Sequence, residues 1–498
     1  MRRLRRTAGL PPRESVMTIP ENIFAMPPPE RRVYCNRTLN LRSIRAVGYD
    51  MDYTLVHYQV EAWEQRAFLA LRDKLADLGW PVDDVRFNPE QVIRGLLIDT
   101  KLGNLIKANR FGYVTRACHG TRPMPFDVQR EVYGRTEVEL SDRRFVFLNT
   151  LFSLSEASMY AQLVDRLDRG LLPGAIGYAD LYREVKRCLD EAHMEGELKA
   201  EILSRPEQFV EADPELVLTL LDQLKAGKRL LLITNSEWSY TQRIMAHALD
   251  RHLPAGQTWR DLFELVILSA RKPDFFSHRM PLFELATPDG LLKPCPGGIC
   301  RPGVYVGGDA RQVEAYLGVS GEEILFVGDH IFTDVHVSKD IMRWRTALIL
   351  RELEGELTAL SAFQQHQNQL VQLMEAKIAL EHRHAQLRTQ LQRAESAYGP
   401  APVADPQRLR SEIGSLRSRL EALDDQIGPL ARESGELRNH TWGLLMRAGN
   451  DKSLLARQVE HYADVYTSRV SNFLHESPFA YLRAPRGSLP HDAVPFRE

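Results

Sequence analysis

The sequence IRAVGYDMDYT, residues 44–54, joins a short apolar run to two aspartates that lie one residue apart, Asp50 and Asp52. An apolar run of about four to eight residues that ends in polar side chains is typical of a buried strand in a parallel sheet. In such sheets, ligands bind beyond the carboxyl ends of the strands. The motif therefore predicts two carboxylates at the ligand-binding edge of a parallel sheet.

Further apolar runs end in polar residues in the same way, and they cover residues 230–233, 262–268, 324–327 and 346–350. The gap before the run at 230 is far longer than a crossover connection needs. Residues 58–212 are therefore expected to form an insertion, with helical patterns at 61–78 and 181–203. We predict an α/β fold: a Rossmann-like parallel sheet with a large inserted cap.

The chain after residue 355 has a different composition, rich in Gln, Leu, Arg and Glu. Apolar residues from Leu409 to Leu430 recur at alternating steps of four and three, and a weaker repeat runs from Leu370 to Leu391. This spacing is a heptad seam. With a Pro-rich turn between them, the two repeats predict an antiparallel, coiled-coil-like helical hairpin. It could protrude and serve in assembly, or it could pack on the enzyme's own surface. Pro429 is expected to disturb the second helix near its end.

The predicted organisation has five parts along the chain. They are a flexible basic arm over 1–30, a catalytic α/β core over 31–57 and 213–355, a cap for substrate recognition over 58–212, the helical hairpin over 356–440, and a C-terminal segment over 441–498 that packs back on the core.

The bulk composition excludes several classes of protein. The 498 residues carry a formal net charge of −2, whereas a protein built to bind nucleic acid has a marked basic excess. No apolar stretch of about 18 residues is present, so no membrane span is predicted. The five cysteines are scattered and form no CxxC pair, which favours free thiols in a reducing compartment. We therefore expect a cytoplasmic protein without nucleic-acid or membrane partners.

The paired aspartates suggest a specific chemistry. Asp50 can attack phosphorus, while Asp52 can protonate the leaving oxygen and later activate water. Two carboxylates this close repel each other, so a cation is needed, and Mg²⁺ prefers oxygen ligands. A lone DxDxT sequence is nevertheless a weak signal.

The later strand ends supply groups that complement this pair. Thr234, Asn235 and Ser236 offer donors to phosphate oxygens, although such a turn can also begin a helix. Lys272 can neutralise the phosphate, or it can be an ordinary loop lysine. Asp329 is placed to bind magnesium. Asp334 is placed to support the metal ligands without binding the metal itself, or to orient Lys272. Both could also be surface acids. Their fixed order at successive strand ends makes coincidence a poor explanation.

This ordered set resembles the haloacid dehalogenase superfamily, and within it the cytosolic purine (IMP/GMP-preferring) 5′-nucleotidase family. The resemblance extends over about residues 31 to 491. It rests on GYDMDYTL (48–55), GNLIK (103–107), LNTLF (148–152), TNS (234–236), ARKP (270–273) and GDHIF (328–332).

The resemblance implies a role for each matched residue. Asp50 is the nucleophile and Asp52 the general acid and base, with Lys272 completing the catalytic set. Asp50, the backbone carbonyl of Asp52, and Asp329 hold Mg²⁺. Thr234, Asn235, Ser236 and Lys272 hold the phosphate.

In the cap, the resemblance implies that Phe152 stacks on the base and that Asp190, His193 and Lys199 lie near it. Lys186 stands where the family usually has an arginine, and a lysine cannot make a planar bidentate contact. Base preference is therefore less firmly implied than the reaction. These cap residues could also be the polar face of an amphipathic helix.

The predicted function is magnesium-dependent hydrolysis of purine nucleoside 5′-monophosphates, by a homo-oligomer (a dimer or tetramer). Three alternatives remain open. The aspartyl-phosphate could be discharged to a nucleoside, the substrate could be another phosphomonoester, or the protein could be a scaffold whose catalytic centre has lapsed.

Overall fold

The computed structural model describes residues 26–174, 177–194, 196–400 and 404–487. Most of the predicted basic arm (1–25) and the end of the family resemblance, beyond 487, lie outside these residues. The five predicted segments stay predictions as domains. Within the described ranges, no helix is both long and apolar enough to cross a membrane.

A ten-stranded sheet forms the centre of the molecule, in the order β1-β20-β17-β16-β3-β11-β12-β15-β13-β14. The pairs from β20 to β15 are parallel, and β1, β13 and β14 add antiparallel edges. The strands are β1 Tyr34–Cys35, β3 Ala46–Tyr49, β11 Arg229–Ile233, β12 Leu265–Leu268, β13 Leu282–Leu285, β14 Leu292–Pro294, β15 Gly303–Gly307, β16 Ile324–Gly328, β17 Arg345–Ile349 and β20 Val465–Thr467. This confirms the predicted fold class.

Alternate residues of the sheet enter two separate apolar clusters. Leu230 and Leu232 pack on one face, with helices α7 (Pro214–Lys225) and α8 (Trp238–Leu249). Leu231 and Ile233 pack on the other, with α10 (Ala310–Leu317). Because both faces are covered, the strands are continuous apolar runs. The predicted run at 262–268 is shortened to β12 because Trp259–Leu262 forms a 3₁₀ turn.

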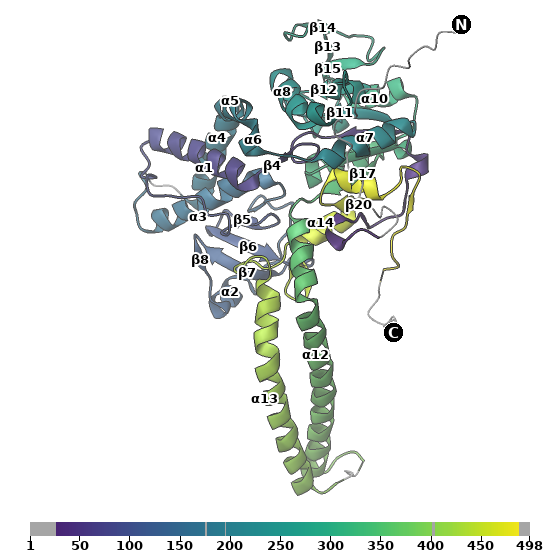
Figure 1. Cartoon of the computed structure of the whole chain (residues 1–498). Helices are drawn as coiled ribbons and strands as arrows, with labels where there is room; N and C mark the ends of the chain where they lie inside the picture. The colour runs from purple at the N-terminus through teal and green to yellow at the C-terminus, as the bar shows by residue number, and fades with distance from the viewer. Residues whose placement is uncertain (1–25, 175–176, 195, 401–403, 488–498) are drawn as a thin grey trace, which may run out of the picture.

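The insertion between β3 and β11 contains a five-stranded antiparallel sheet that the sequence did not predict. Its strand order is β8-β7-β6-β5-β9, and helices pack beside it (Figure 1). The strands are β5 Leu97–Asp99, β6 Asn104–Ala108, β7 Val114–His119, β8 Arg122–Pro123 and β9 Phe145–Phe147; the helices are α1 Val60–Asp77, α2 Phe126–Tyr133, α3 Leu154–Asp168, α4 Tyr178–Met194, α5 Glu197–Ser204 and α6 Pro206–Phe209.

The helix predicted over 181–203 is divided into α4 and α5. Gly196, directly before α5, has φ +78°, a left-handed conformation that ends a regular helix and is natural for glycine. The break matters for the site, since His193 lies on one side of it and Lys199 on the other.

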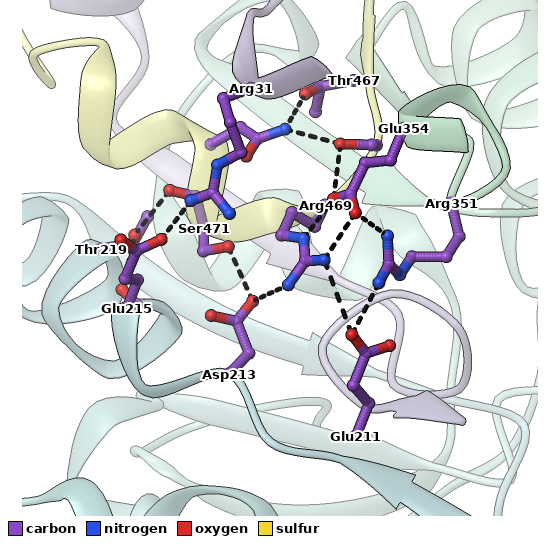
Figure 2. A network of polar contacts seen from close by, with 12 residues as sticks. Arg31, Glu211, Asp213, Glu215, Thr219, Arg351, Glu354, Thr467, Arg469 and Ser471 are labelled. Carbon is purple, nitrogen blue, oxygen red and sulfur yellow. Dashed lines mark hydrogen bonds and ion pairs between the residues drawn. The ribbon is translucent and has the colours of Figure 1, made fainter. Parts of the chain in front are cut away.

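The chain enters and leaves the insertion through a small hinge, in which β4 (His57–Tyr58) pairs with β10 (Val210–Glu211). A network of arginines and carboxylates surrounds this hinge (Figure 2). Arg351 donates to Glu211 at 2.6 Å, and Arg469 donates to Glu354 at 2.7 Å. The hinge is thereby tied to the first turn of the hairpin and to the C-terminal segment.

The helical hairpin projects from the body of the molecule, which is the first of the two arrangements that the sequence left open (Figure 1). Its helices are α12 (Leu353–Ser396) and α13 (Pro406–Glu436). The predicted seam of α13 faces inward, with Leu409, Leu416 and Ile427 buried. Pro429 lies inside α13, which continues to Glu436. The chain then returns to the core through α14 (Leu454–Tyr462) and β20.

Candidate active site

Four neighbouring strands deliver the predicted catalytic residues to one edge of the sheet. Asp50 and Asp52 follow β3, and residues 234–236 follow β11. Lys272 follows β12, while Asp329 and Asp334 follow β16. Since these strands are adjacent and parallel, their carboxyl ends meet, and side chains up to 284 positions apart in sequence become neighbours.

Lys272 is the centre of the charged cluster. Its Nζ lies 2.7 Å from Asp50 Oδ1 and 2.7 Å from Asp334 Oδ1. Its side chain is almost fully buried. Although burial disfavours the charged amine, the carboxylates of Asp334 and Asp50 raise the pKa of Lys272. The lysine is therefore a fixed positive charge beside Asp50.

Burial disfavours the charged form of the carboxylates around Lys272. Burial raises the pKa of Asp50 well above its ordinary value, against the opposing effect of Lys272. Burial also raises the pKa of Asp329 to about 7, although Arg94 lowers it. Such shifts are typical of a site that is completed by a cation or a substrate.

Asp52 points away from this cluster. Tyr58 donates its hydroxyl to Asp52 Oδ1, and Ser236 donates to Oδ2 at 2.9 Å. The hydroxyl of Tyr240 lies 2.9 Å from that of Tyr58 and extends the chain of hydrogen bonds. Burial raises the pKa of Asp52 although these donors oppose it, so its carboxyl group is suited to carry a proton.

The loops after β11 and β12 hold each other in place. The amide group of Asn235 accepts from the backbone N of Lys272 at 2.7 Å and donates to its carbonyl oxygen at 3.3 Å. Thr234 Oγ1 accepts from the backbone N of Ser236 at 3.1 Å. Asn235 thus fixes the position from which Lys272 enters the cluster.

Three carboxylates form a possible metal site. Asp50, Asp329 and Asp334 each place an oxygen within 4.8 Å of the others. The residues predicted as ligands were Asp50, Asp52 and Asp329. The Asp52 carboxylate faces Tyr58 and Ser236, and a contribution from its backbone carbonyl stays a prediction. An all-oxygen set of this kind suits a hard divalent cation such as Mg²⁺.

A cavity of about 500 Å³ opens beside Asp52 and extends under the cap. Four of the five predicted cap residues line it: Phe152, Lys186, His193 and Lys199. Asp190 does not line it, but it pairs with Lys186 at 3.0 Å. The structure therefore brings four of the predicted cap residues to the same cavity as Asp52.

The wall of the cavity combines aromatic rings with charged groups. Phe152 makes edge contacts with Tyr53 and Trp63 at centroid distances of 4.6 and 5.5 Å. Lys186 lies 3.4 Å from the buried carboxylate of Glu156. Burial lowers the pKa of His193 to about 4, helped by Lys186, so this histidine is neutral at pH 7.

Several site residues were not predicted from the sequence. They are Tyr58, Tyr240, Trp63 and Glu156. Each lies in a helix or strand whose apolar sequence pattern does not indicate that one of its side chains faces the site. Thr150 donates to Asp329 at 3.4 Å, and it lies inside the LNTLF stretch. That stretch was the one sequence signal that could have identified any of them.

The chain is similar to several known proteins. Residues 33–494 match the model of the 5′ nucleotidase family. A 5′-nucleotidase domain-containing protein of Dictyostelium discoideum is 25% identical over 477 residues, which cover 92% of this chain and 74% of that protein. Human 5′-nucleotidase domain-containing protein 2 is 30% identical over 353 residues, covering 67% of this chain and 65% of the human protein. A solved β-phosphoglucomutase from Pyrococcus sp. has a TM-score of 0.30 and 11% identity, covering 62% of this chain and 87% of its own.

Proposed function

Because the chain belongs to the 5′ nucleotidase family and is thus a phosphoric monoester hydrolase, we propose that it hydrolyses purine nucleoside 5′-monophosphates through an aspartyl-phosphate at Asp50. The observation that carries this proposal is the position of Asp50 at the end of β3, 2.7 Å from the buried Lys272. A carboxylate held beside a fixed cation can approach a phosphate without prohibitive repulsion.

In the proposed reaction, an Asp50 carboxylate oxygen attacks phosphorus and the bond from phosphorus to the nucleoside 5′-oxygen breaks. Asp52 gives its proton to that oxygen, and the nucleoside leaves. Asp52 then takes a proton from water as the water attacks the aspartyl-phosphate, which releases phosphate and restores Asp50. The hydrogen bonds from Tyr58 and Ser236 support this assignment because they hold Asp52 apart from Lys272.

The charges of the site support a divalent cation. Four carboxylates (Asp50, Asp52, Asp329 and Asp334) are buried or nearly so, against two buried cations, Lys272 and Arg94. Asp50, Asp329 and the carbonyl of Asp52 would hold Mg²⁺, with Asp334 directed to Lys272. When bound, the metal supplies charge stabilisation for the transferring phosphoryl group.

The cavity under the cap supports a purine nucleoside as the leaving group. Phe152 offers a ring to the base, and Lys186 and Lys199 offer cationic donors. His193 Nε2 is buried and has no hydrogen-bond partner among the described residues, so it is free to bond a ring nitrogen or a 6-oxo group. By resemblance to its family, the enzyme would act in the cytoplasm as an oligomer built from dimers.

The test is phosphate release from IMP, GMP, AMP and CMP in MgCl₂, beside the Asp50→Asn variant. Asp424→Asn, the same chemical change on the exposed hairpin, is the matched control. Release from IMP and GMP that EDTA abolishes, and that only Asp50→Asn eliminates, supports the proposal. If folded, Mg²⁺-treated protein releases phosphate from none of the four, the proposal is wrong. Adding inosine shows whether phosphate is instead transferred to a nucleoside.

A further inference from the structure

Arg94 is a buried arginine that connects the cap to the catalytic edge of the sheet. Its side chain is 0% exposed. Its Nη2 donates to the backbone carbonyl of Asp329, and its Nε donates to the carbonyl of Asn149 at 2.9 Å. One guanidinium therefore joins the loop after β16 to the segment that follows β9.

The remaining nitrogen of Arg94 faces the hairpin. Nη1 lies 3.6 Å from the carboxylate of Glu352, the residue directly before α12. Neither this nitrogen nor either Glu352 carboxylate oxygen has a hydrogen-bond partner among the described residues. The two charges consequently depend on each other in a region sheltered from solvent.

A buried guanidinium is costly, by several kcal/mol without partners. A neutral side chain could also donate hydrogen bonds to two carbonyl groups, so these bonds alone do not require a charged one. Arginine has a planar fork that can hold acceptors in several fixed directions, which a lysine cannot do. Arg94 uses that fork to reach Asp329, Asn149 and Glu352 at once.

The backbone beside Arg94 is also fixed. Gly95 has φ +87°, and a Cβ at this position would lie 2.9 Å from Leu455 of α14. Its backbone N donates to the carbonyl of Leu148 at 2.7 Å. Any other residue at position 95 would place its Cβ too close to Leu455, in a left-handed conformation that L side chains rarely adopt.

We propose that Arg94 is a positioning residue for the metal loop: it fixes the Asp329 peptide so that the Asp329 carboxylate faces Asp50, and Glu352 at the root of the hairpin orients Arg94. This inference rests on the proposed function, because it assumes that Asp329 holds Mg²⁺. It links the hairpin to the catalytic centre through one side chain.

The test compares Arg94→Lys with Arg116→Lys. Arg116 lies on β7 and also donates to two backbone carbonyls near the hairpin root, those of Gly435 (2.8 Å) and Thr441, but it does not contact the catalytic loops. The first readout needs no substrate: the MgCl₂ concentration that gives half of the Mg²⁺-dependent rise in melting temperature. Steady-state kinetics with IMP then separate kcat from KM.

Arg94→Lys is expected to raise the required MgCl₂ concentration about tenfold or more, as is usual when a group supporting a metal ligand is lost. Its kcat should fall at low MgCl₂ and recover at high MgCl₂, with KM unchanged. Arg116→Lys should lower the melting temperature without altering the Mg²⁺ requirement. Glu352→Gln should shift the requirement in the same direction as Arg94→Lys but less, and it keeps the test decisive if Arg94→Lys does not fold.

Two contrary outcomes are distinguishable. If wild-type protein is stabilised by MgCl₂ and both Arg94→Lys and Glu352→Gln need the same concentration as wild type, the role of Arg94 is wrong and the proposed function stands. If MgCl₂ does not stabilise wild type at all, the proposed metal site is wrong and the inference about Arg94 falls with it.

Discussion

Two clusters of charged residues, one at the carboxyl end of β3 and one around the pair of strands β4 and β10, are built differently. In the hinge cluster of Figure 2, each of the carboxylates Glu211, Asp213, Glu215 and Glu354 lies within 3.9 Å of an arginine nitrogen. In the catalytic cluster, Asp52 and Asp329 make no ion pair within the described part of the chain. A cluster that satisfies its own charges is structural, whereas one with unmatched carboxylates is prepared for a ligand.

The pKa of Glu354 at the hinge shifts in the opposite direction to those of the catalytic carboxylates, whereas burial raises the pKa of Asp213, whose arginine partner lies 3.9 Å away. At the hinge, Arg469 and Arg351 overcome burial and lower the pKa of Glu354 to about 2. At the catalytic edge, burial prevails and raises the pKa of Asp50, Asp52 and Asp329. The hinge arginines thus offset burial at Glu354, whereas burial prevails at the catalytic carboxylates.

The largest effect is expected from Asp50→Asn. Phosphate release should fall at least about 1,000-fold because the nucleophile is gone. The melting temperature without Mg²⁺ should stay the same or rise, since one of three neighbouring carboxylates (Asp50, Asp329 and Asp334) is neutralised while Lys272 keeps Asp334 as a partner. Assays beside thermal denaturation check both effects. A variant that keeps a tenth of wild-type activity would remove Asp50 from the mechanism.

Arg469→Ala should show the reverse pattern. Its side chain is 12% exposed, and its loss leaves Glu354 and Asp213 with fewer partners, which should cost about 3 kcal/mol of unfolding free energy. The kcat of the folded variant should stay within about threefold of wild type. Urea denaturation at pH 7 measures the loss, with the exposed Arg457→Ala as the control. A large fall in kcat at unchanged stability would show that the hinge cluster serves catalysis instead.

The sequence predicted the catalytic cluster far better than the hinge cluster. Asp50, Lys272 and Asp329 each follow an apolar run, and the topology of a parallel sheet brings such positions together. Arg351 and Arg469 follow no pattern of this kind, since their partners are set only by how the hairpin and the C-terminal segment return to the core. Arg94 was missed for the same reason.

Strands were missed where local sequence carries little signal. β15 reads GVYVG, with a glycine at each end, and β20 has three residues. Both contain residues that favour strands, such as Val and Tyr, but they are too short to form a distinct apolar run. The cap sheet was missed because its strands are short and its cross-strand pairs join segments with weak alternation.

A further buried carboxylate lies outside both clusters. Glu64 on α1 is 0% exposed, and its one described partner is the backbone N of Ser155, at 2.8 Å. Burial raises the pKa of Glu64 to about 8, although Ser155 opposes the shift. No ion pair to Glu64 is present among the described residues, so the folded state favours the protonated form of its carboxyl group.

The unfolding free energy of the Glu64→Gln variant should therefore increase relative to that of wild type as pH rises. In the unfolded chain Glu64 releases its proton near 4.5, while the folded state keeps it until about pH 8. Wild-type stability contributed by this proton is present below pH 4.5 and is lost as pH rises through 8. Relative to wild type, the variant should gain about 3–4 kcal/mol between pH 5 and pH 8, at about 1.4 kcal/mol per pH unit. Urea titrations at both pH values measure it, with the exposed Glu61→Gln as control; an equal difference at both values would show that Glu64 is ionised in the fold.

The smallest effect is expected from Lys377→Ala, which tests whether an exposed ion pair stabilises the fold. Lys377 on α12 pairs with Asp424 on α13 across the hairpin, and Asp424 is 55% exposed. Both charges are well hydrated whether or not they meet, and salt screens their attraction. The variant should unfold at the same temperature as wild type in about 0.15 M salt. A drop as large as that of Arg469→Ala would mean that burial does not distinguish the hinge cluster from the hairpin surface. If the prediction holds, the hinge arginines stabilise the fold because their partners are sheltered from water, and the catalytic carboxylates destabilise it for the same reason.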